Sequence, residues 1–301
     1  MNTAVRPAAV DWSQVTCATL RVRLMYRYAY SAPVADLRQR LIMVPPHVHG
    51  GQRLLADSLT VGGAEDTECV WQTDPFGNRV MWVTATRIAE AIEFVAEFDV
   101  ERRADAPPHH LRANASPAVY LAPTALTAPN RALREAAQAI RAEVGRAAIG
   151  DADARQWELA RLAQSWSARA ITYRVGVTGV QTPAAMALHL GQGVCQDFAH
   201  IALTVLRLLG VPARYVSGHL LGEGVPHAWI EALLPDPAEP GRLCAVAFDP
   251  THDRAPALNY VTVAGGRDYG DVAPTSGVYT GPNAGGQLSS EKHASVLSVS
   301  Q

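Results

Sequence analysis

The sequence predicts an α+β protein in which a β-sandwich-like module precedes a second domain of helices and strands. Three observations support this prediction: apolar residues alternate with period 2 in the first hundred residues, prolines cluster after them, and helical periodicity follows. Of the 301 residues, 48% are apolar and 18% are charged, which is typical of a globular chain. Such a length predicts about two domains.

Short strands are expected first. The alternating runs occupy residues 20–28, 68–72, 79–86 and 92–100. Turn-forming residues separate these runs at Pro45-Pro46, Gly62-Gly63 and Asp74-Pro-Phe-Gly-Asn78. Because regular turns without a helical period are typical of a β-sandwich, we expect an all-β N-terminal module over residues 1–105.

Helices are expected beyond a Pro-rich break. The break predicts a linker over residues 106–128, followed by a second domain over residues 129–281. Helical patterns occupy residues 130–144, 152–170 and 182–190, the last with Pro183 at the first helical position after a Thr cap. A further helix ends at Gly210 and is apolar on almost every side, which indicates a buried core helix.

Strand-like runs return after this helix, at residues 213–220, 227–233 and 243–248. The last residues, 282–301, are rich in Gly and Ser, so we expect a flexible tail there.

Charge and composition exclude several functions. The formal net charge is -2, so we expect neither a nucleic acid nor a membrane as a partner. Lys292 is the single lysine and lies in the expected tail, which argues against Schiff-base, pyridoxal and P-loop chemistry. The chain starts without an apolar signal-peptide core and has no run of 18 apolar residues, so we expect a cytoplasmic protein.

The four cysteines are far apart, and Cys195 differs from the others by its position. It precedes the buried helix directly after a Gly-x-Gly turn. Unpaired N–H groups and the helix dipole favour a thiolate there, and the same N–H groups could stabilise an oxyanion. The alternative for Cys195 is a small buried apolar residue. We expect packing roles for Cys17, Cys69 and Cys244, which lie in strand patterns.

A thiol nucleophile needs a base and a group that orients the base. His227 begins a strand after a Gly-rich segment, and Asp249 ends the next strand-like run. Period 2 places His227, Trp229 and Glu231 on one face of their strand. This arrangement predicts a Cys-His-Asp hydrolase centre.

Five segments in order resemble the transglutaminase-like superfamily in its bacterial branch. They are Gly193-Val-Cys-Gln-Asp-Phe-Ala-His200, Gly210-Val-Pro-Ala-Arg-Tyr-Val-Ser-Gly218, His227-Ala-Trp-Ile-Glu231, Phe248-Asp-Pro-Thr251 and Gly266-Arg-Asp-Tyr-Gly-Asp-Val-Ala-Pro-Thr-Ser-Gly-Val-Tyr279. The N-terminal half also resembles the region that precedes this domain in bacterial members. The resemblance implies a papain-like cysteine hydrolase core over residues 129–281.

The resemblance further implies Cys195 as nucleophile, His227 as base and then acid, and Asp249 as the orienting residue. A thiolate of this family attacks an amide carbonyl, and water or an amine releases the acyl group from the thioester. Amide hydrolysis of a peptide or small amide, amine acyl transfer and a non-catalytic binding role therefore remain as alternatives. Candidate pocket or supporting residues are Gln196, Trp229, His219, Tyr173 and Asp268.

Neither a metal nor another cofactor is expected. His47 and His49, and likewise His109 and His110, are interpreted as loop histidines, because the sequence around them has no Cys or acidic cluster. A calcium loop of the D-x-D-x-D-G type is also missing from the sequence. The sequence indicates no oligomeric state.

Overall fold

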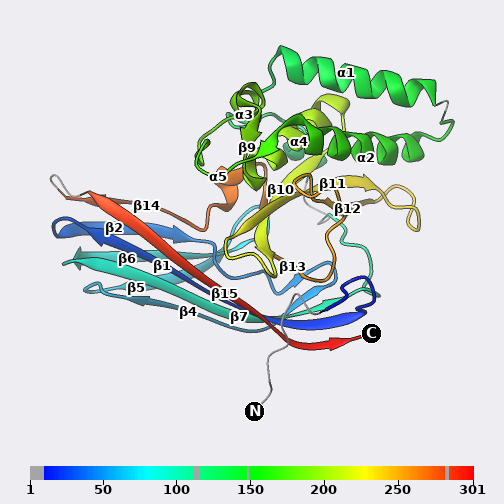
Figure 1. Cartoon of the computed structure of the whole chain (residues 1–301). Helices are drawn as coiled ribbons and strands as arrows, with labels where there is room; N and C mark the ends of the chain where they lie inside the picture. The colour runs from blue at the N-terminus through cyan, green and yellow to red at the C-terminus, as the bar shows by residue number, and fades with distance from the viewer. Residues whose placement is uncertain (1–9, 112–115, 148, 282–284) are drawn as a thin grey trace.

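The computed structural model describes residues 10–111, 116–147, 149–281 and 285–301. A layer of helices covers one four-stranded sheet, and two further sheets of long strands lie beside that sheet (Figure 1). This architecture confirms the predicted α+β class. Among the described residues, no helix is long and apolar enough to cross a membrane.

Two antiparallel sheets form the module that begins the chain. One has the order β15-β1-β7-β4-β3 and the other β14-β2-β6-β5. The strands are β1 (Cys17–Tyr30), β2 (Val34–Leu41), β3 (Val48–His49), β4 (Gln52–Gly62), β5 (Glu68–Thr73), β6 (Arg79–Ile88), β7 (Ala91–Arg103), β14 (Thr275–Thr280) and β15 (Gly286–Ser300). All four strands predicted in this region are confirmed, as parts of β1, β5, β6 and β7.

Alternation along β7 explains how the two sheets pack. Ile92, Phe94, Ala96, Phe98 and Val100 are buried on one face, and the residues between them are more exposed. Each fully buried phenylalanine contributes roughly 1.5–3 kcal/mol relative to an exposed one. The apolar row of β7 therefore forms the centre of the core that the two sheets share.

The sequence reasoning missed β2 because its apolar residues do not alternate. Val34, Leu37 and Leu41 are all buried, although they are three and four residues apart. Asp36 has a φ of 53° in the middle of this strand. A residue in the left-handed conformation shifts the alternation of the strand by one position. Val34 and Leu37, which are three residues apart, can therefore both be buried on one face.

The second part of the chain packs helices on a sheet of order β12-β11-β10-β13. Its elements are η2 (Pro117–Tyr120), α1 (Arg131–Arg146), α2 (Ala152–Ala170), β8 (Thr172–Tyr173), α3 (Ala184–Leu190), β9 (Gln192–Gly193), α4 (Cys195–Leu209), β10 (Ala213–Leu220), β11 (His227–Pro235), β12 (Leu243–Phe248), β13 (Tyr260–Gly266) and α5 (Tyr269–Val272). The predicted helices and strands of this region are confirmed. The strand β13 was not predicted.

The helix α4 is the central element of this part. Thirteen of its 15 residues are buried, between the other helices and β11. It ends at Gly210, which has a φ of 83° and donates to Arg207 O and Leu206 O. Two predicted helix starts are corrected: Cys195 is the first residue of α4, and Pro183 is the N-cap of α3, so Thr182 does not cap that helix.

The expected flexible tail is wrong for the described residues 285–301. Most of them form β15, which pairs with β1 from Cys17 to Tyr30. Backbone hydrogen bonds do not depend on side-chain polarity, and Val296 fixes the strand by packing its side chain into the core. Likewise β14, expected in the second domain, pairs with β2 of the first module. The end of the chain therefore returns to the N-terminal sheets.

Candidate active site

Cys195 lies at the first position of α4 and is partly exposed. The approach to it is β9, whose Gly193 pairs with Tyr173 of β8. A Cβ atom on Gly193 would lie 2.6 Å from Asp197 Oδ2, so only glycine fits there. The tight turn before the helix thus brings the sulfur to the surface at a helix N-terminus.

Asp197 and Gln196 hold the segments around this cysteine. Asp197 Oδ2 accepts hydrogen bonds from Val194 N at 2.7 Å and from Thr178 Oγ1 at 2.7 Å. A carboxylate in the first turn binds N–H groups that have no partner within the helix. Gln196 Nε2 donates to Val180 O at 3.2 Å, so Gln196 ties the loop before α3 to the cysteine.

His227 and Asp249 meet at the ends of neighbouring strands. The distance from His227 Nε2 to Asp249 Oδ2 is 2.8 Å, and both residues are buried. Because an ionised carboxylate only accepts, His227 Nε2 carries a proton and donates it to Asp249. Cys195 lies close enough to His227 to be among the groups that raise the pKa of its ring. The structure therefore brings all three predicted residues together.

The protonation of His227 follows from these neighbours. Burial opposes the charged ring, but the hydrogen bonds and charges of Asp249 and Cys195 outweigh burial and raise the pKa of His227 to about 9. Burial raises the pKa of Asp249, but the hydrogen bonds to His227, Tyr260 and His252 outweigh burial and hold the pKa of that carboxyl below its ordinary value. An imidazolium between a carboxylate and a sulfur is the charge state that a thiolate nucleophile requires.

Sequence reasoning missed two further partners of Asp249. His252 Nδ1 donates to Asp249 Oδ2 at 2.7 Å, and Tyr260 Oη donates to the same oxygen at 2.7 Å. Asp249 Oδ1 accepts from Thr251 N at 2.9 Å. His252 could have been suspected from its position three residues after Asp249, because a turn brings such residues together. Tyr260 comes from the unpredicted strand β13 and left no local signal.

A cavity of ≈ 430 Å³ adjoins His227. Its walls are formed by Tyr173, Glu223, Gly224, Val225, His227, Thr251 and His252. Tyr173 is 49% exposed and Val225 is 56% exposed, so the cavity opens to solvent between them. Glu223 Oε2 lies 3.4 Å from His227 Nδ1, and Glu223 Oε1 lies 3.5 Å from His252 Nε2. An acidic side chain thus lies beside the imidazole.

Two family descriptions match the chain in order. Residues 20–101 match the bacterial transglutaminase-like N-terminal region, and residues 130–241 match the transglutaminase-like superfamily. Residues 130–241 belong to the transglutaminase-like superfamily. The second match includes Cys195 and His227 and ends before Asp249.

One solved structure and two mycobacterial proteins illustrate what this chain is similar to. A candidate cysteine protease of Cytophaga hutchinsonii has the same fold, with a TM-score of 0.66 and 20% identity over 92% of this chain and 91% of that chain. An uncharacterized protein of Mycobacterium leprae is 42% identical over 132 residues, and one of Mycobacterium tuberculosis is 40% identical over 118 residues. These matches span 44% and 37% of the mycobacterial proteins and 40% and 36% of this chain.

The other predicted pocket residues of the transglutaminase-like domain have separate places. Trp229 is buried and stacks on His227, with ring centroids 6.1 Å apart. His219 is not among the described residues that line the cavity beside His227. Its ring is buried on β10 and packs toward Phe98. Asp268 caps the short helix α5 by accepting from Gly270 N at 2.8 Å. Tyr173 lies in the cavity wall, as expected for a pocket residue.

Lys292 also lies elsewhere than the sequence indicated. It projects from β15, is partly buried, and donates to Leu220 O at 3.2 Å and to Val225 O at 2.8 Å. Burial lowers the pKa of Lys292 to about 8, although the charge of Glu223 opposes this shift. The loop of residues 221–226 contains Glu223, which lies beside His227. Lys292 of the N-terminal sheet binds a carbonyl oxygen near each end of this loop.

The interpretation of His49 and His110 as isolated loop histidines is wrong. His49 Nε2 lies 2.8 Å from Glu231 Oε1, and His110 Nε2 lies 2.5 Å from Asp236 Oδ2. Both carboxylates are far away in the sequence, so local composition did not reveal them. His110, Asp236 and Glu239 place their ligand atoms within 4.8 Å of one another, as do His49, His109 and Glu231.

Proposed function

We propose that this chain is a cysteine-dependent amide hydrolase that acts on a peptide or small amide through an acyl-thioester. The observation that carries the proposal is the hydrogen bond between His227 and Asp249, with Cys195 close to His227 at the N-terminus of α4. Cys195 is partly exposed, and its neighbour His227 lines a cavity, so a substrate carbonyl could reach the sulfur from solvent.

In the first step, the Cys195 thiolate attacks the amide carbon and forms a C–S bond. The carbonyl oxygen becomes negative, and the N–H groups of Cys195 and Gln196 can bind it, because the first two positions of α4 have no acceptor within the helix. His227 Nδ1 then gives its proton to the leaving nitrogen, and the C–N bond breaks. Asp249 keeps Nε2 protonated throughout, so Nδ1 is the nitrogen that exchanges the proton.

In the second step, water attacks the thioester while His227 Nδ1 takes its proton. The C–S bond breaks, the acid leaves, and the thiolate and imidazolium are restored. An amine in place of water would give acyl transfer by the same route. Hydrolysis is favoured because the cavity beside His227 opens to solvent, and acyl transfer requires that water be kept from the thioester.

The test uses p-nitrophenyl acetate as a general acyl donor. Wild type should release a burst of nitrophenolate and gain one acetyl group on the Cys195 peptide in mass spectrometry. Cys195→Ala should give neither, whereas Cys69→Ala, which removes an exposed cysteine outside the cavity, should behave as wild type. A burst that persists in Cys195→Ala would sink the proposal.

The same assay separates hydrolysis from transfer. A labelled primary amine is added after the burst, and acetate and labelled amide are both quantified. Acetate as the main product supports hydrolysis, and labelled amide as the main product at millimolar amine would replace the proposal with acyl transfer. A chain that never acylates, in spite of native folding, would favour the binding role.

A further inference from the structure

A second cavity lies behind the catalytic residues, between the two parts of the chain. Its volume is ≈ 160 Å³. One wall is Trp229 and Tyr260, whose rings meet edge to face with centroids 5.4 Å apart. The opposite walls come from Arg102 at the end of β7 and from Glu231 on β11. Trp229 and Tyr260 therefore separate this cavity from Asp249 and His227.

Arg102 reaches the cavity because of the alternation along β7. It lies on the same face of the strand as Phe98 and Val100, whose side chains are buried between the sheets. Its Nε is closed off from solvent, and no hydrogen-bond partner for Nε exists among the residues that the structure describes. Burial lowers the pKa of Arg102 to about 10, against the opposing charge of Glu231. Arg102 is partly buried, and its unpartnered Nε–H is a suitable donor to an anion in this cavity.

Glu231 cannot supply that compensation by itself, because Arg214 already binds it. Arg214 Nε lies 2.6 Å from Glu231 Oε2, and His49 occupies Oε1. Burial alone would raise the pKa of Glu231, but Arg214 and His49 hold it well below the ordinary value, so Glu231 is ionised. Among the described residues that line the two cavities here, Glu231 is the one carboxylate against the guanidinium groups of Arg102 and Arg214, which leaves one positive charge in excess.

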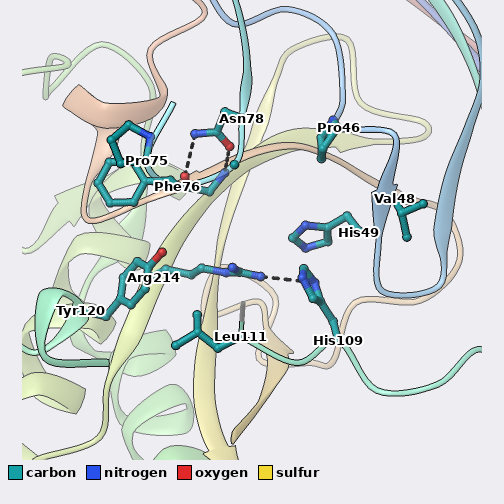
Figure 2. A pocket seen from close by; sticks show the side chains of 12 residues that line it. Pro46, Val48, His49, Pro75, Phe76, Asn78, His109, Leu111, Tyr120 and Arg214 are labelled. Atoms are coloured by element: carbon teal, nitrogen blue, oxygen red, sulfur yellow. Dashed lines mark hydrogen bonds between the residues drawn. The ribbon is translucent and has the colours of Figure 1, made fainter. Parts of the chain in front are cut away.

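Figure 2 shows the other side of the same cluster. His49 and His109 lie together, with ring centroids 4.1 Å apart, and Arg214 points toward His109 with Nη2 3.4 Å from Nδ1. Both histidines line the cavity of Figure 2 and also the cavity that contains Arg102. Imidazole N–H groups beside a guanidinium group are suitable donors to an oxyanion.

We propose that this cavity is a binding site for a small oxyanion, held by the guanidinium group of Arg102 beside His49 and His109. The ligand chemistry is a carboxylate or a phosphate group of few atoms. Because Arg102 belongs to the N-terminal sheet and Glu231 to the second sheet, the bound anion would hold the two parts of the chain together. The site is separate from Cys195 and does not depend on the proposed hydrolysis.

A divalent metal is the competing occupant, since His49, His109 and Glu231 have ligand atoms within 4.8 Å of one another. Charge argues against it. Both oxygens of Glu231 are engaged, and two guanidinium groups beside a cation would repel it.

The experiment measures the thermal midpoint of the whole chain by tryptophan fluorescence. Inorganic phosphate and acetate are titrated separately at constant ionic strength, with sodium chloride as the balancing salt. At about ten times Kd, binding should raise the midpoint of wild type by about 2–4 °C. Arg102→Met should remove the rise, and Arg103→Met, which changes the exposed neighbour that pairs with Asp105, should keep it.

A second readout separates binding from a merely structural role. Without added anion, Arg102→Met should be at least as stable as wild type, because a partly buried charge with an unpartnered Nε is gone. If that variant does not fold, Arg102→Lys is used, which should keep a smaller rise. A shift with phosphate shows the phosphate class, and a shift with acetate shows the carboxylate class. No shift with either, an equal shift in the Arg102 variant, or a shift with Zn²⁺ alone overturns the proposal.

Discussion

The hydroxyl of Tyr260 donates a hydrogen bond of 2.7 Å to Asp249 Oδ2, the oxygen that also accepts from His227 Nε2. Tyr260 itself accepts from Arg254 Nε at 2.9 Å. A residue of β13 thus fixes the carboxylate that binds the imidazole. Three donors on one carboxylate oxygen leave it little freedom to rotate.

Tyr260→Phe should therefore lower kcat/KM without removing the nucleophile. A hydrogen bond to a charged group is worth about 1.5–3 kcal/mol, which corresponds to a loss of roughly 10- to 100-fold if all of it acts in the transition state. Tyr30→Phe on β1 is the control, because Tyr30 lies outside this network. Equal rates for both variants would show that Tyr260 does not position Asp249.

The pH dependence should follow His227. Its pKa of about 9 lies above the ordinary value of 6.5, so the folded state holds this proton more tightly than the unfolded chain. The resulting stability is fully present below pH 6.5 and is lost as pH rises through 9. Activity should fall over the upper part of this window, because deprotonated His227 cannot protonate the leaving nitrogen.

Asp249→Asn should move that alkaline limb of the rate profile to lower pH. The substitution removes the negative charge that helps to raise the pKa of His227. We expect kcat to fall by about 10²- to 10⁴-fold, as for loss of a positioned acid or base. The measurement is kcat/KM against pH for both proteins, and an alkaline limb at the same pH in both would contradict the assignment.

Lys292→Met should loosen residues 221–226 and raise KM more than it lowers kcat. The lysine holds this segment through Leu220 O and Val225 O, while Glu223 and Val225 line the cavity. His293→Gln changes the exposed neighbour on β15 and serves as the matched control. Lys292→Arg keeps a donor at this position and should therefore raise KM less than Lys292→Met does. An unchanged KM in Lys292→Met would show that the contact of Lys292 does not shape the cavity.

Gly218→Ala should destabilise the fold and disturb Trp229. A Cβ atom at Gly218 would lie 2.1 Å from Val261 O and 2.5 Å from the Trp229 ring. Overpacking of this kind reduces the free energy of unfolding by about 1–3 kcal/mol. Gly145→Ala in α1 meets nothing within 4 Å and should stabilise the helix by about 0.5–1 kcal/mol. Urea unfolding of both variants provides the comparison.

Residues with a local signal were predicted from the sequence. Cys195 follows a Gly-x-Gly turn before an apolar helix, and His227 and Asp249 lie at strand ends, so these three residues could be singled out as candidates from their neighbours along the chain. Alternation and helical spacing also predicted most elements, because side-chain burial has a fixed period within one strand or helix.

Contacts between distant segments were decided by the tertiary structure alone. Tyr260 reaches Asp249 from an unpredicted strand, and Arg102 and Glu231 face one cavity although 129 positions separate them (231 minus 102). Lys292, expected in a flexible tail, holds the loop before His227 because β15 pairs with β1. Strand pairing depends on backbone groups that every residue carries, so side-chain pattern could not show where the last strand would attach.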